Sequence, residues 1–84
     1  MTWVIAWRGQ AWTEDDLLAG DLATVQALTD GTWVECNPWR GPVELMAMIA
    51  TLAARTEHRD VQAVLDEIRL SPAAEVQQAI ARRD

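Results

Sequence analysis

The segment 42–54 constrains the fold of this chain more than any other. Wound as a helix, it carries apolar side chains nearly all the way round, and Glu44 and Thr51 are the main polar exceptions. A helix with this pattern lies at the centre of a core or is buried in an assembly. The preceding Gly41-Pro42 predicts where it starts, because proline suits the first position of a helix. In a chain of 84 residues, which can build one modest core, this helix must organise the rest of the fold.

Residues 2–12 predict a β-hairpin. β-Forming side chains stand on both sides of an Arg-Gly-Gln turn, and their alternation places Trp3, Ile5 and Trp7 on one face. A two-stranded ribbon is only marginally stable by itself. The tryptophan face of the hairpin must therefore pack on helices or on another chain.

Three further helices are expected, at about 21–29, 60–70 and 72–82. Asp60 is a good N-cap for the second of them, which carries one clean apolar stripe. Ser71 caps the third, whose stripe is thin, so its last residues are expected to fray unless a partner covers them. These elements predict a single domain of the α+β class, mainly helical, in which an N-terminal β-hairpin packs on a small bundle of about four helices.

The charge of the chain restricts its partners. The net charge is −6, and the stretch from Glu14 to Glu35 holds acidic residues and no basic one. Nucleic-acid binding requires a basic footprint, which this chain lacks. A basic protein partner for the acidic stretch stays open, although such a run is usually a solvated face. No apolar run has the length of a membrane span, no signal peptide is visible, and the single cysteine fits a reducing compartment, so the sequence predicts a cytosolic protein.

Patterns for catalysis and metal binding are weak. Cys36 and His58 are the candidates for a thiol–imidazole pair, but no flanking motif supports them. A divalent cation needs several carboxylates, yet the spacing typical of a calcium loop is absent from the candidate acids Glu14, Asp15, Asp16 and Asp21. No glycine-rich phosphate loop follows a strand. We therefore expect no enzyme, no cofactor and no metal site.

The chain has five tryptophans and neither phenylalanine nor tyrosine, so these rings must supply most of the bulk of the core. Trp3, Trp12 and Trp33 are expected there. Trp39, which stands just before the apolar helix, either fixes the turn onto that helix or is exposed as an interface anchor. Methionine adapts to varied apolar partners. The partner-binding hypothesis places four residues on or next to the working surface: Trp39, Arg40, Met46 and Met48.

Four segments of the chain carry a resemblance to a known family. In order, they read WVIAWRGQAWTEDDL, LAGDLA, NPWRGPVELM and SPAA. In order and spacing they resemble the small tail assembly chaperones of long-tailed bacteriophages that infect GC-rich actinobacteria. The resemblance implies a non-enzymatic protein of the host cytoplasm that binds the tape measure protein, keeps its long apolar helices soluble and recruits tail tube subunits. It also implies a longer frameshifted form, of which this chain would be the shorter counterpart.

Two other classes of function stay open. In the first, the chain is a structural neck or tail component, a homo-oligomer held in a ring by a permanent interface through the apolar helix. In the second, it is a small acidic inhibitor or antitoxin that offers Asp15, Asp16 and Asp21 as a decoy for a basic site. Presence in purified particles would favour the first, and loss of binding on charge reversal would favour the second.

Overall fold

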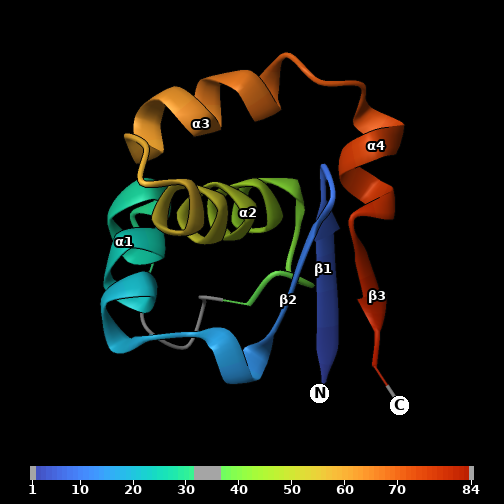
Figure 1. Cartoon of the computed structure of the whole chain (residues 1–84), viewed down its shortest axis with the longest axis horizontal. Helices are drawn as coiled ribbons and strands as arrows, with labels where there is room; N and C mark the ends of the chain where they lie inside the picture. The colour runs from blue at the N-terminus through green and yellow to red at the C-terminus, as the bar shows by residue number, and fades with distance from the viewer. Residues whose placement is uncertain (1, 32–36, 84) are drawn as a thin grey trace.

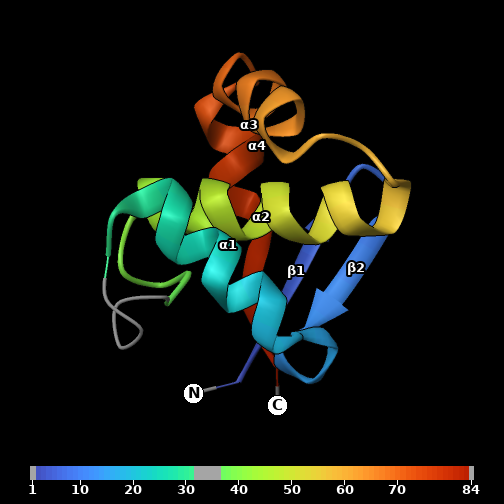
Figure 2. The ribbon, with the colours of Figure 1, turned by 90° about the vertical axis from the view of Figure 1, so that its left-hand side faces the viewer.

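Helix α2 (Pro42–Glu57) runs through the middle of the molecule in the computed structural model, which describes residues 2–31 and 37–83. Helix α1 (Ala19–Thr29) lies on one side of it and the β-sheet on the other, as two perpendicular views agree (Figure 1, Figure 2). Helix α3 (Val61–Arg69) crosses above them. Every residue from 47 to 54 is buried, so the prediction of a central apolar helix is confirmed.

The N-terminal hairpin is confirmed and is part of a larger sheet. Strands β1 (Trp3–Trp7) and β2 (Gln10–Thr13) pair antiparallel. Arg8 and Gly9 both have positive φ, 49° and 82°, which is the backbone of a two-residue turn that matches the twist of the strands. The third strand, β3 (Ile80–Arg82), pairs antiparallel with β1, so the strand order is β2-β1-β3. The fold is α+β, as expected.

The prediction of a long C-terminal helix over 72–82 is wrong. Helix α4 (Ala73–Gln78) is short, and the chain then turns extended to form β3. Its apolar stripe is thin, and with Val76 buried it supports a helix of only about one and a half turns. A helix this short has little stability of its own. The exposed edge of β1 offers backbone partners instead, beginning with a 2.7 Å hydrogen bond from the Ala6 N–H to the Ala79 carbonyl oxygen. Residues 80–83 are therefore paired with the N-terminal strand, where fraying was expected.

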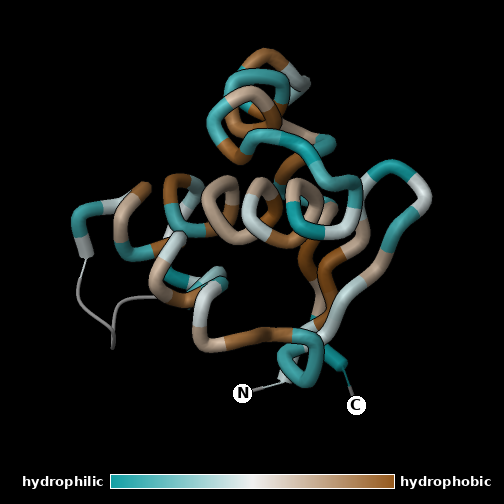
Figure 3. The backbone as a smooth tube through the Cα atoms, turned by 60° about the vertical axis from the view of Figure 1, so that its left-hand side comes forward, coloured by the Kyte–Doolittle hydropathy of each residue, from teal (hydrophilic) through white to brown (hydrophobic). Residues whose placement is uncertain are grey.

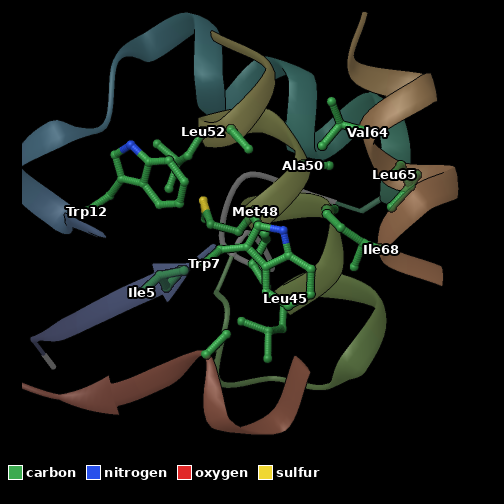
Figure 4. Close-up of a cluster of buried hydrophobic side chains, with 14 of the residues drawn as sticks. Ile5, Trp7, Trp12, Leu45, Met48, Ala50, Leu52, Val64, Leu65 and Ile68 are labelled. Carbon is green, nitrogen blue, oxygen red and sulfur yellow. The ribbon is translucent and has the colours of Figure 1, made fainter. Parts of the chain in front are cut away.

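The tryptophan face of the sheet packs against α2. Trp3, Ile5 and Trp7 are all at most 5% exposed, and Trp12 joins them from β2 (Figure 4). Each buried indole removes roughly 150–250 Å² from water, which is worth about 4–6 kcal/mol on the usual area scale. The core placement of Trp3 and Trp12 is confirmed, whereas Trp33 lies outside the described residues. Figure 3 shows hydrophobic residues in α2 and in part of the strands beside it, and hydrophilic ones at the hairpin turn.

Helix α1 begins earlier than the predicted 21–29. The Asp21 carboxylate accepts a 2.9 Å hydrogen bond from the Leu18 N–H, and this satisfies a backbone donor just before the first turn. Gly20 therefore lies within the helix. A short 3₁₀ turn, η1 (Glu14–Asp16), precedes it. Helix α3 agrees with its expected range, and its predicted cap is confirmed by a 3.1 Å hydrogen bond from the Ala63 N–H to Asp60.

Candidate functional site

An apolar groove of about 420 Å³ opens at the N-terminal end of α2. It lies between the start of that helix, the end of α3, helix α4 and the first residue of β3. A volume of this size is typical of ligand pockets in proteins. Residues from all of these elements line it: Pro38, Trp39, Gly41, Pro42, Leu45, Met46, Ile68, Arg69, Ser71, Ala73, Val76, Gln77 and Ile80.

The turn before α2 positions Trp39. The Asn37 side-chain oxygen accepts a 2.9 Å hydrogen bond from the Trp39 N–H, and the Asn37 carbonyl accepts one of 3.0 Å from the Arg40 N–H. Such a turn is what an Asn-Pro sequence favours, because the asparagine side chain closes the loop onto its own backbone. Pro38 is buried in the same turn. Trp39 is consequently held against the first turn of α2 and forms one wall of the groove.

The indole nitrogen of Trp39 distinguishes it from Trp12. Trp39 is half-buried, and its Nε1–H is enclosed with no acceptor within reach among the described residues. The Trp12 Nε1–H, in contrast, donates a 3.1 Å hydrogen bond to Thr56 Oγ1. An enclosed donor without an acceptor costs roughly 1–3 kcal/mol. The contribution of Trp39 is therefore its apolar ring, which both packs on the core and lines the groove. Its role as an interface anchor stays a prediction.

The two methionines of the hypothesis separate in the structure. Met46 is half-buried and lines the groove. Met48 is completely buried in the same cluster as Trp7 and Trp12 (Figure 4), so its placement at the working surface is wrong. The reason is helical geometry, because residues two positions apart lie on different faces of a helix. Arg40 is exposed and stays outside the groove lining, with its Nε 3.7 Å from the Glu44 carboxylate.

Several walls of the groove were not identified from the sequence. Ile68 belongs to the apolar stripe of α3, whereas the helix expected over 72–82 would carry Val76 and Ile80 on its one thin stripe. In the fold, Ile80 is in a strand and Val76 in a helix, yet both face the same hollow. No local pattern could have indicated this, because it depends on where the chain turns after Gln78.

The opposite end of α2 is polar. A second hollow of about 490 Å³ lies there between α1, α2 and the start of α3. Asp21 is only 4% exposed in its wall and accepts a 3.0 Å hydrogen bond from Arg55 Nε, while another nitrogen of Arg55 donates to the Asp16 carbonyl. Asp21 therefore serves the fold and is not available as part of a surface decoy, which corrects that element of the inhibitor hypothesis.

The α2–α3 corner carries an exposed ion pair. Two nitrogens of Arg59 donate to the two carboxylate oxygens of Glu67, at 3.0 and 2.5 Å. These hydrogen bonds lower the pKa of Glu67 below its ordinary value, with a smaller contribution from the positive charge itself. The pair connects the loop after α2 to the last turn of α3.

Candidate catalytic and metal-binding side chains are dispersed. Among residues 2–31 and 37–83, no three side chains of the His, Cys, Asp or Glu type come close enough to share a metal ion. His58 is exposed at the C-terminal end of α2, in the left-handed conformation with φ of 55°. Cys36, its hypothetical partner, lies outside the described residues.

Known proteins give no guide to this site. No protein-family model, curated protein sequence or solved structure matches the chain. Within the part of the chain that the structure describes, none of the helices combines the length and apolar character needed to cross a membrane. The groove has to be interpreted from its own shape and chemistry.

Proposed function

We propose that this protein binds an apolar segment of a partner protein in the groove at the start of α2, and that it does so as an assembly chaperone. The observation that carries the proposal is the groove itself, which has walls of Trp39, Leu45, Met46, Val76 and Ile80. The resemblance to tail assembly chaperones supplies the partner in this proposal, which is the tape measure protein of a bacteriophage. The tail tube subunit is a second partner. The site of action is the host cytoplasm.

The apolar surface continues beyond the groove. Val43 is 54% exposed on the first turn of α2, and Met46 lies one turn further along the same face. Val43 and Met46 thereby extend the apolar surface of the groove that a partner would contact. The unbranched Met46 side chain can adjust to different apolar partners, as a chaperone requires.

The alternatives lose part of their basis. The ring hypothesis relied on the apolar circumference of α2, but the sheet, α1 and α3 cover that circumference within one chain. The inhibitor hypothesis loses Asp21, which is buried and paired with Arg55.

The test is co-expression with the tape measure protein encoded in the same genome, followed by measurement of its soluble fraction and of the affinity of the complex. Val43→Asp is the best variant, because an acidic residue in the first turn of a helix favours folding while its charge opposes an apolar contact. We expect it to weaken binding about tenfold, equivalent to roughly 1.4 kcal/mol. Met46→Asp should weaken binding at least as much.

Leu18→Asp is the matched control. Leu18 is 56% exposed, close to the exposure of Val43, but it borders the polar hollow at the other end of α2. This variant should bind like the wild type. If the folded Val43→Asp and Met46→Asp variants bind the tape measure protein as tightly as Leu18→Asp does, the groove is not the binding site. If the wild type leaves the tape measure protein insoluble, the chaperone function is wrong.

A further inference from the structure

The register of the sheet determines which backbone groups of β3 face outward. Ala6 and Ala79 stand opposite each other and share a hydrogen bond, as do Thr2 and Arg83. Hydrogen-bonded pairs alternate with non-bonded pairs along an antiparallel ladder. Ala81 is therefore the residue of β3 that exchanges hydrogen bonds with β1. The N–H and C=O groups of Ile80 and Arg82 point away from β1, along the outer edge of the sheet.

The two edges of the sheet differ. At the edge of β2, the Thr13 N–H is occupied by a 2.8 Å hydrogen bond to the Asp16 carboxylate, and the 3₁₀ turn η1 follows directly. At the edge of β3, no strand of the described chain pairs with the outer side. An edge with unpaired backbone groups is a template for a further strand. Of the two edges, the edge of β3 is the one that adjoins the groove, because Ile80 lines it, so we take this edge as the candidate for a further strand.

This edge is continuous with the groove. Ile80 is the first residue of β3, is half-buried, and lines the groove with its side chain. Residues directly opposite each other on neighbouring strands point their side chains to the same face. A partner residue that paired with Ile80 would therefore direct its own side chain toward the groove. Helix α4, which lies at the N-terminal end of β3 in Figure 1, contributes Val76 to the same hollow.

Two arginines lie near this edge, although the net charge of the whole chain is −6. Arg82 is exposed and forms no ion pair with any carboxylate among the described residues. Arg69 stands at the groove with more than half of its side chain exposed, in a loose 3.6 Å pair with Asp66. A segment bound here would gain from acidic side chains next to its apolar ones.

We propose that the groove and the free edge of β3 together bind one extended apolar segment flanked by acidic residues, which joins the sheet as a fourth strand. An α-helix can fill the groove, but its backbone groups are bonded internally and cannot pair with Ile80 and Arg82. An extended segment satisfies both features at once. This inference rests on the proposed function and specifies the form in which the partner is bound.

The experiment is amide hydrogen exchange by NMR with a blocked octapeptide of alternating leucine and glutamate as the probe. We expect exchange at Ile80 and Arg82 to slow about tenfold or more on binding, because these amides gain acceptors. The Ala81 amide, already bonded to β1, is the internal control and should not change. A peptide of the same composition in the order Glu-Leu-Leu-Glu-Glu-Leu-Leu-Glu, which suits a helix, should bind more weakly.

Arg82→Pro removes one outward N–H and leaves the residues that pair with β1 in place, whereas Arg82→Ala removes only the side chain. We expect about a tenfold loss of peptide affinity for the first and a smaller loss for the second. If Arg82→Pro disturbs β3, the backbone of the peptide is changed instead. Two peptides are made, one N-methylated at its odd residues and the other at its even residues. Only the peptide whose methyl groups fall on the N–H groups that face β3 should fail to bind. If the peptide shifts Met46 and Val76 signals but leaves the Ile80 and Arg82 amides exchanging as in the free protein, or causes no shift, the strand-addition inference is overturned. Binding of the tape measure protein in that case would leave the proposed function intact.

Discussion

The two ends of α2 are built in opposite ways. At the C-terminal end, polar side chains connect the helix to the rest of the chain: Trp12 to Thr56, Gln10 to Glu57, and Arg55 to Asp21. At the N-terminal end, the neighbouring surfaces are apolar and leave a groove, and the indole nitrogen of Trp39 has no acceptor among the described residues. The same helix is thus held by polar contacts at its C-terminal end, which we call the closed end although the second hollow lies beside it, and bordered by the apolar groove at its N-terminal end, the open end.

Under the proposed function, stability and binding depend on opposite ends of the same helix. Polar contacts between distant segments fix the geometry of the closed end, since each partner is costly to leave unpaired. The open end is held mainly by apolar contact, which has no direction and permits side chains to rearrange. A small domain can keep an apolar groove open when the rest of its core is complete. Substitutions at the two ends should therefore have different consequences.

The largest difference is expected between two arginines. Arg55→Ala leaves the buried Asp21 carboxylate without its cation, and this should cost about 3 kcal/mol of unfolding free energy. Arg69→Ala, at the open end, removes an exposed pair and should cost less than about 0.5 kcal/mol. Urea denaturation of the two variants measures both values. Equal losses would show that the closed end does not depend on this buried pair.

A smaller difference is expected between two tryptophans. Trp12→Phe removes the hydrogen bond to Thr56 and leaves a small void in the core, so it should cost about 2 kcal/mol. Trp39→Phe also removes ring volume, but it eliminates the enclosed N–H that has no acceptor, so stability should stay within about 0.5 kcal/mol of the wild type. Thermal unfolding of both variants tests this. A large loss for Trp39→Phe would mean that its indole nitrogen is bonded.

The smallest effect concerns pH at the α2–α3 corner. Hydrogen bonds from Arg59 lower the pKa of Glu67 in the folded state, so the ionised pair contributes stability above the unfolded pKa, and this contribution is lost as the pH falls through the folded pKa. The ordinary pKa of a glutamate is about 4, so the stability that the ion pair contributes is expected to be lost below about pH 4. An NMR titration that follows the Glu67 carboxyl carbon should give a pKa below that of a free glutamate. Arg59→Ala should raise it, and no change would contradict the assignment.

The candidate site was only partly predictable. Trp39 and Met46 could be named because the proline-framed turn and the apolar helix are adjacent in sequence. Met48 was placed wrongly, since an all-round apolar helix gives no indication of which face its neighbours will cover. Val76 and Ile80 became groove walls only because α4 ends early and β3 follows.

The sequence by itself determined the features that depend on local periodicity and caps. These are the central helix, the hairpin with its tryptophan face, and the α3 stripe that begins after Asp60. The tertiary structure decided the conformation and burial of the residues whose local pattern is weak. Residues 80–82 became a strand because β1 had an unpaired edge, and Asp21 became buried because Arg55, far away in the chain, reaches it. A strand edge and a buried charge each need a distant partner, and only the folded chain brings that partner into contact.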